Sequence, residues 1–179
     1  MDSIYSHYAD ALLSLAKEEK KVLEYKLALI DIEDYLNTHD EVKKYIESYF
    51  INFDSKVEII DLIAKEFQLD NLANFIKVIV KKHRFLIFDK IVKEYIEIAN
   101  LELNILEGYV YSTIELSSED MKKLERAISN KLHQEVELKN RIDESLIGGV
   151  KIVISDHVYD GSLKAKLQSL KLSLKERRN

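Results

Sequence analysis

The residues best suited to chemistry in this 179-residue chain are Asp156, His157 and Asp160, which lie close together in the sequence. Two carboxylates beside an imidazole are ordinary metal ligands, so the group suggests a metal-dependent enzyme. The same residue types are also typical of turns, and here they stand between two short strand-like runs. The five histidines are dispersed, and none forms a His-x-x-x-His pair. We therefore interpret the three as turn residues and keep the metal-dependent enzyme as an alternative.

No motif supports nucleophilic catalysis or phosphate binding. A Ser-His-Asp triad converges only in space, and the chain has neither a nucleophile elbow nor a phosphate-binding loop to indicate one. We therefore expect no catalytic residue, no cofactor and no metal ligand.

Three of the four glycines gather near the C-terminal end of a chain that has no proline. A dinucleotide loop places its glycines after a strand and before a helix, whereas Gly148-Gly149 precede the strand-like run 150–154. This pair is typical of a tight corner where backbones approach closely. The following Asp160-Gly161-Ser162 favours a turn, with Ser162 as the cap of a last helix.

Composition narrows the functional classes. The chain lacks cysteine, which excludes disulfides and thiolate metal sites, and its formal net charge of -5 is unfavourable for a nucleic-acid binder. The basic run Lys81-Lys82-His83-Arg84 and the basic tail 175–178 fit solvated helix ends, where the helix dipole favours cations. An adaptor for nucleic acid that uses these ends is a further alternative.

Two observations bear on location. No apolar run reaches the ~20 residues that a membrane-spanning helix needs. The start, Met-Asp-Ser-Ile-Tyr-Ser-His-Tyr, lacks the basic beginning and apolar centre of a secretory signal. We expect a cytoplasmic protein, which is compatible with docking on a membrane complex.

Up to about Glu107 the apolar residues recur at helical spacing. The Ser55/Glu58 pair has the spacing of a capping box, and Asp70 is a second expected cap. The pattern predicts six short helices with brief connections, which indicates a helical bundle. Their apolar faces fall in the runs 4–15, 22–36, 42–49, 57–67, 72–80 and 88–98.

The period changes at Gly108. Alternation from Val110 through Ser112 and Ile114 to Leu116 predicts a strand, and Ser117 begins a helix-like run. Strands are predicted over 136–142 and 150–154, and a leucine-faced helix follows Ser162. The fold class is therefore α+β, with an N-terminal six-helix bundle over residues 1–105 and a small C-terminal α/β domain over residues 106–179. We expect the two domains to be separable and the isolated chain to be a monomer.

In this order the elements resemble a known family. The stretch Leu146-Ile-Gly-Gly-Val-Lys-Ile-Val-Ile-Ser-Asp-His-Val-Tyr-Asp-Gly-Ser162 is similar to the C-terminal signature of the delta subunit of F-type ATP synthases, whose mitochondrial relative is the oligomycin-sensitivity-conferring protein. The stretches 8–16 and 74–85 resemble the family's first helix and its fifth helix with the following turn. One departure is His83, which stands where the family often has glycine.

The resemblance implies a non-catalytic stator subunit. In this family the helical domain binds N-terminal segments of the alpha subunits of the catalytic head, and the C-terminal domain binds the b-type subunits of the peripheral stalk. The protein would couple proton-driven rotation to ATP synthesis from the cytoplasmic face of the bacterial plasma membrane. A small cytoplasmic helical adaptor is the first alternative.

The resemblance also implies where the head binds, in a groove between the first and fifth helices. The corresponding residues on the two helices are Tyr8, Ala11, Leu12 and Leu15, and Phe75, Val78 and Ile79. The alternative is that these residues are bundle core. Ala11 is the most informative of them, because a small residue lets a partner helix approach.

Overall fold

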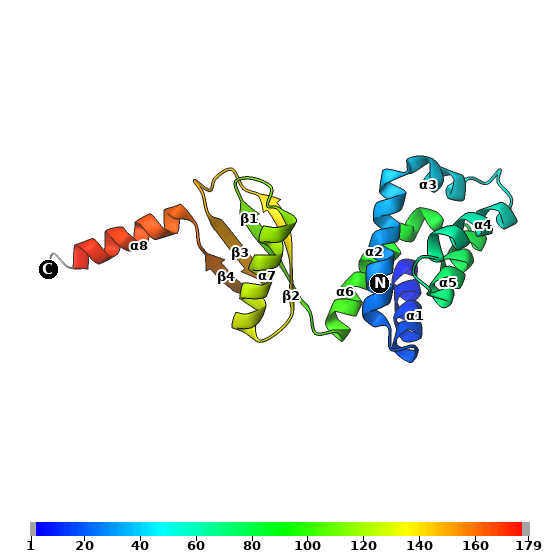
Figure 1. Cartoon of the computed structure of the whole chain (residues 1–179), viewed down its shortest axis with the longest axis horizontal. Coiled ribbons are helices and arrows are strands. Elements are labelled where there is room, and N and C mark those ends of the chain that lie inside the picture. The colour runs from blue at the N-terminus through cyan, green and yellow to red at the C-terminus, as the bar shows by residue number, and fades with distance from the viewer. Residues whose placement is uncertain (1–2, 177–179) are drawn as a thin grey trace. The chain divides into compact units, whose positions relative to one another are not determined.

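The computed structural model describes residues 3–176 (Figure 1). Within that range the chain forms eight α-helices, one 3-10 helix and four strands, so the predicted α+β class is confirmed. The chain divides into two compact units, and the first ends at Leu103 while the second begins at Asn104. Each unit is described by itself below.

The helical unit carries its helices where the apolar periodicity predicts them. They are α1 (Ile4–Glu18), α2 (Val22–Thr38), α3 (Asp40–Glu47), α4 (Phe53–Ala64), α5 (Asp70–Lys81), the 3-10 helix η1 (Phe85–Ile87) and α6 (Phe88–Glu102). All of them contribute to one hydrophobic core.

Large side chains fill this core. Tyr25 and Phe88 are almost completely buried, and so is Tyr95, whose hydroxyl donates to the carbonyl of Val22 at 3.3 Å. Lys26 is also buried and donates to the side-chain oxygen of Asn100 at 2.5 Å. Because buried polar groups are costly unless they are hydrogen-bonded, these contacts fix α2 against α6.

Two predicted helix caps are wrong. Helix α4 begins at Phe53, and the side chain of Asn52 accepts the N–H of Ser55 at 2.8 Å. Ser55 is therefore inside the helix, because Asn52 is an equally good cap that comes first in the chain. Asp70 is the first residue of α5 and not its cap. In the first turn its negative charge is favourable, because the N-terminal end of the helix dipole is positive.

Within residues 3–176, five helices are followed by a left-handed residue that is not glycine. These residues are Lys20, Gln68, His83, Asn104 and His133, with φ between 53° and 57°. Glycine is the usual choice there, and a side chain in this conformation costs about 1–2 kcal/mol. His83 thus adopts the conformation for which glycine is best suited.

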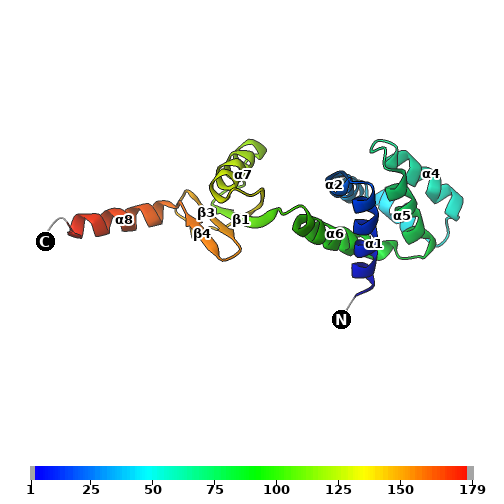
Figure 2. The same cartoon turned by 90° about the horizontal axis from the view of Figure 1, so that it is seen from below.

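The second unit is a four-stranded sheet with two helices. Strands β1 (Leu106–Ser112) and β2 (Val136–Ile142) are parallel and are joined through α7 (Ser118–Leu132). Strands β3 (Val150–Ile154) and β4 (His157–Asp160) complete the order β2-β1-β3-β4, and α8 (Leu163–Glu176) follows. Helix α7 lies over one face of the sheet (Figure 2), and the core between them includes Val110, Ile128, Leu138 and Ile152.

The predicted extent of the first strand is wrong. Strand β1 ends at Ser112, whose hydroxyl donates to the carbonyl of Ile114 at 2.6 Å, and Ile114 is 69% exposed. Gly108 lies inside the strand, where an added Cβ would be only 2.5 Å from Ile154 Cγ1 and 2.8 Å from the carbonyl oxygen of Val153. The glycine at which the period changes is therefore required by the close packing of β1 against β3.

Strand β2 lies at one edge of the sheet, and α7 covers part of its backbone. The N–H of Val136 donates to Ser129 Oγ at 3.1 Å, and the N–H of Leu138 donates to Glu125 Oε1 at 3.0 Å. Two polar side chains of α7 thus occupy donors that an edge strand otherwise presents to another chain.

Candidate partner-binding site

The residues implied for head binding come from α1 and α5 and separate into two groups. Leu12 and Ile79 have no exposed surface and belong to the core of the helical unit. Ala11 and Val78 are exposed, Val78 to 48%, while Tyr8, Leu15 and Phe75 are half-buried. We call the last five residues the α1–α5 face.

Aromatic packing connects the two helices of this face. The rings of Tyr8 and Phe75 meet edge to face, with centroids 6.1 Å apart and an interplanar angle of 73°. Ala11 follows Tyr8 by three residues on α1, and Val78 follows Phe75 by three residues on α5, so each lies about one helical turn further along. The result is an apolar surface with a small residue exposed on it, which suits contact with another helix.

Polar contacts near both ends of α1 join it to α5 and to the turn that follows α5. Arg84 Nη1 donates to the Tyr8 hydroxyl at 2.6 Å, and its guanidinium carbon lies 5.5 Å from the centre of the Tyr8 ring. Beyond the opposite end of α1, Glu19 accepts from the Asn71 side chain and from the Tyr25 hydroxyl. These hydrogen bonds, that from Asn71 first, lower the pKa of Glu19. The contact of Arg84 with Tyr8 was not foreseen, because the sequence pattern shows only a basic helix end.

The glycine pair forms a corner at the start of α8. Gly149 has φ of 81°, and an added Cβ would lie 2.6 Å from the carbonyl oxygen of Gly161 and 3.0 Å from the Cα of Ser162. At Gly148 a Cβ would meet a side-chain carbon of Leu163 at 2.9 Å, and the Gly148 carbonyl accepts the N–H of Leu163 at 2.9 Å. Two segments of backbone therefore touch here without room for a side chain.

The turn after β4 is closed by its own side chains. Asp160 Oδ1 accepts the N–H of Ser162 at 2.9 Å, and Ser162 Oγ accepts the N–H of Ala165 at 3.2 Å. The hydrogen bonds from Ser162 lower the pKa of Asp160. This arrangement sets the direction in which α8 follows β4.

The three residues that suggested a metal site, Asp156, His157 and Asp160, lie in the hairpin formed by β3 and β4. Asp156 lies in the turn between β3 and β4, and His157 and Asp160 are the two ends of β4. All three are exposed. Between residues 3 and 176, no three side chains of metal-binding type are grouped to hold an ion.

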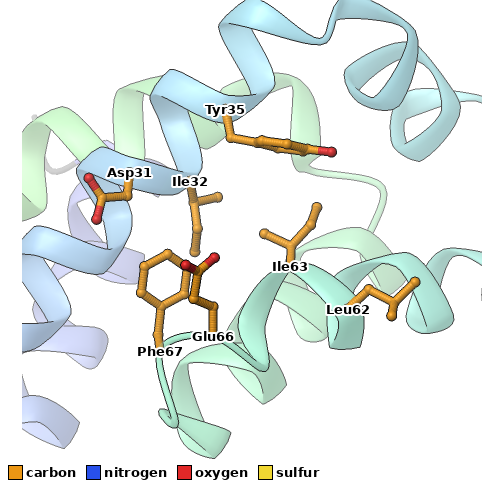
Figure 3. Close-up of a pocket in the computed structure, with 7 residues that line it drawn as sticks. All are labelled: Asp31, Ile32, Tyr35, Leu62, Ile63, Glu66 and Phe67. Atoms are coloured by element: carbon orange, nitrogen blue, oxygen red, sulfur yellow. The ribbon is translucent and has the colours of Figure 1, made fainter.

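A hollow that the sequence did not indicate lies between α2 and α4. It has a volume of about 380 Å³ and mixes apolar with acidic residues (Figure 3). We call it the α2–α4 groove; it is lined by Asp31, Ile32, Tyr35, Leu62, Ile63, Glu66 and Phe67. The only sequence signal for it is that Tyr35 and Leu62 are apolar residues beside, rather than on, the core-facing stripes of their helices.

In the part of the chain that the structure describes, no helix is both long and apolar enough to cross a membrane.

Comparisons with known proteins agree over nearly the whole chain. The family model for the ATP synthase delta (OSCP) subunit matches residues 4–174. ATP synthase subunit delta of Mycoplasma capricolum is 36% identical over 174 residues, which cover 95% of each chain. The proteins of the same name from Mycoplasma mobile and Clostridioides difficile are 31% and 30% identical and cover at least 94% of either chain.

A solved structure has the same fold. A chain in the cryo-EM structure of the Toxoplasma gondii mitochondrial ATP synthase hexamer is similar with a TM-score of 0.63, over 96% of this chain and 97% of that chain. The two sequences are only 17% identical, so this likeness concerns the fold alone.

The fold and the exposed apolar faces define an α+β protein suited to binding other proteins. The chain belongs to the ATP synthase delta (OSCP) family. It is a structural subunit of the stator, the peripheral stalk of the ATP synthase, and does not itself catalyse the reaction.

Proposed function

We propose that this chain joins the catalytic head of the ATP synthase to the peripheral stalk through one surface on each of its units. The helical unit, within residues 1–105, binds N-terminal segments of the alpha subunits. The sheet unit, within residues 106–179, binds the b-type stalk subunits. Family membership supports the role, and the exposed apolar faces support the assignment of the two surfaces.

The assignment of head binding to the helical unit depends mainly on Ala11, which is exposed between the half-buried Tyr8 and Leu15. An amphipathic helix binds by laying its apolar side on such a face, with anchors at helical spacing. A residue as small as alanine allows the two helices to approach closely. Leu12 and Ile79 lie beneath the face and act by supporting it.

For the stalk, the surface begins at the glycine corner. Leu163 and Leu167 are one helical turn apart on α8, and both are exposed. Two exposed leucines on one side of a helix are suited to packing against another helix, and the b-type subunits are the partners we assign to them. The corner at Gly149 and Gly161 fixes where α8 starts.

The mechanical role follows from having both sites on one chain. A head held at one unit and a stalk held at the other cannot turn with the rotor, so rotation is coupled to ATP synthesis rather than lost. Linking two binding sites also raises the effective concentration of the second partner once the first is bound. We place the protein at the cytoplasmic face of the bacterial plasma membrane, attached through the complex and monomeric when isolated.

The substitution Ala11→Arg tests the head-binding assignment. The exposed position tolerates a long side chain in the free protein, but a charge there blocks the approach of an apolar helix. We expect an alpha-subunit N-terminal peptide to bind at least about tenfold more weakly, or ~1.4 kcal/mol, in a calorimetric titration.

Two control variants accompany this test. Ala11→Ser keeps the residue small and should retain the affinity, and Asn37→Arg adds the same charge at an exposed position of α2, outside the face. Thermal unfolding shows whether each variant is folded. Unchanged affinity in Ala11→Arg would place head binding elsewhere and would contradict the assignment.

A further inference from the structure

The α2–α4 groove has the composition of a docking surface. Ile32 of α2 is buried and forms its floor, while Ile63 and Phe67 are half-buried along its side. Tyr35 and Leu62 are exposed, Leu62 to 72%. Figure 3 shows Tyr35 and Ile63 on opposite sides of the hollow, with Asp31 and Leu62 at its two margins. The groove thus places exposed apolar side chains beside charged groups, as interaction sites commonly do.

The carboxylates of the groove lack cationic partners. Asp31 and Glu66 are exposed, and among residues 3–176 neither forms an ion pair, not even with Lys65 on the same turn. Other carboxylates of the unit are paired, as in Asp61 with Lys77 at 2.5 Å. An occupant that covers the apolar residues also removes water from the two carboxylates, so it must supply a positive charge.

The exposed residues of α2 extend the surface beyond the hollow. Leu23, Leu27, Asp31 and Tyr35 follow one another at intervals of four, and all are exposed. Such a row runs obliquely along the helix surface and spans about 18 Å at 1.5 Å per residue. A partner that uses the whole row is a helix of about 12 residues rather than a small molecule.

We propose that the α2–α4 groove binds an amphipathic helical segment of a protein partner, with apolar anchors and at least one lysine or arginine. The apolar anchors fill the space between Ile32, Ile63 and Phe67. The cation lies between Asp31 and Glu66. This surface shares no residue with the α1–α5 face, so it is a second site, and its test is independent of the head-binding assignment.

A peptide titration of the full chain tests this proposal. The probe is a synthetic leucine–lysine peptide of about 14 residues in an amphipathic helical repeat, roughly 21 Å long. We expect backbone amide shifts in nuclear magnetic resonance spectra to cluster on α2, α4 and the turn after α4. A leucine–glutamate peptide with the same repeat should fail to bind there.

Variants of the chain show whether the groove itself is responsible. Asp31→Asn with Glu66→Gln should weaken binding of the leucine–lysine peptide at least about tenfold, or ~1.4 kcal/mol, and Leu62→Ser should weaken it as well. Glu41→Gln with Glu97→Gln removes two charges from exposed positions on α3 and α6 and should leave the affinity unchanged.

Several results would overturn the proposal. They are no binding, shifts confined to the α1–α5 face, equal binding of the leucine–glutamate peptide, or equal affinity in the double Asp31/Glu66 variant. Concentration-dependent self-association that shifts the same residues without peptide would make a second copy the occupant. None of these results would bear on the effect of Ala11→Arg, so the two assignments fail separately.

Discussion

The helical unit and the sheet unit are held together in different ways. The helical unit contains no glycine, and its core is filled by large side chains such as Tyr25, Phe88 and Tyr95. The sheet unit contains all four glycines, and at Gly108 and Gly149 a side-chain carbon would collide with neighbouring atoms. One unit packs side chain against side chain, and the other brings backbone close to backbone.

This difference predicts how each unit responds to substitution. Exposed positions on the helices, such as Ala11 and Leu62, accept new side chains without disturbing the core. Their substitution should change binding and leave stability nearly intact. At the glycine corner there is no room to adapt, so substitution should disrupt the fold of the unit and its binding together.

The largest effect is expected for Gly149→Val. The new side chain meets the carbonyl of Gly161, and valine is also unfavourable at a φ of 81°. Overpacking and the left-handed conformation together should destabilise the sheet unit by roughly 2–5 kcal/mol. Hydrogen exchange should show faster opening of β3 and the start of α8, with α1–α6 unchanged.

The milder variant Gly161→Ala provides a matched comparison, because its Cβ would lie 3.1 Å from the carbonyl oxygen of Val150. A fragment of residues 1–105 gives the reference unfolding transition of the helical unit.

Under the proposed function, Gly149→Val keeps head binding and loses stalk binding, so ATP hydrolysis continues while proton pumping fails. Equal stability of Gly149→Val and the unmodified chain would show that the corner is not close-packed.

A smaller effect, of opposite sign, is expected at the helix ends. Lys20 is left-handed after α1, so Lys20→Gly should stabilise the helical unit by about 0.5–1 kcal/mol, after allowance for the greater freedom of glycine in the unfolded chain. His83→Gly should gain less, because the His83 ring also stacks on Tyr49 with centroids 5.1 Å apart. Denaturant unfolding measures both.

The control for these variants is Lys93→Gly, at an exposed position inside α6. There the backbone is helical, so glycine should destabilise by about 1 kcal/mol. If Lys20→Gly destabilised the unit equally, the left-handed conformation would not be a source of strain, and the contrast between glycine-free and glycine-dependent packing would be weaker.

The smallest effect concerns Glu33 on α2. Burial, and then the nearby charges of Asp89 and Asp34, raise the pKa of Glu33 above 4.5 in the folded state. The folded chain therefore holds this proton more tightly than the unfolded chain, and the contribution to stability is lost as pH rises through the raised pKa. In Glu33→Gln this loss should be absent, leaving the helical unit slightly more stable than the unmodified chain at neutral pH.

Thermal unfolding between pH 4 and pH 8 measures this difference. Asp34→Asn is a suitable comparison, because it removes a neighbouring charge and should reduce the pH dependence only in part. A parallel pH dependence in Glu33→Gln and the unmodified chain would assign the slope to other groups.

Much of the fold follows from sequence periodicity, but its details depend on contacts between distant residues. The six helical runs of the first unit are visible as apolar stripes, whereas β4 has only four residues and is too short to show alternation. The start of α4 was misplaced because Asn52 and Ser55 are both good caps, and the chain order decided between them.

The binding surfaces were predictable to a lesser degree. Helical spacing brings Tyr8, Ala11 and Leu12 to one side of α1, but only packing shows that Leu12 is buried and Ala11 exposed. The α2–α4 groove could not be foreseen, because it depends on Ile32 and Phe67 meeting across 35 positions of sequence. No local pattern carries that information.

The contacts of α7 with strand β2 limit how the sheet can aggregate. A foreign strand that added beside β2 would have to displace Ser129 from Val136 and Glu125 from Leu138. The opposite edge is β4, which offers only four residues. Polymerisation by strand addition requires two open sheet edges on every molecule. A molecule with one open edge can only pair with a second copy, and no further molecule can then be added. While α7 stays packed on the sheet, even an overproduced chain should therefore be protected from fibre growth through β2.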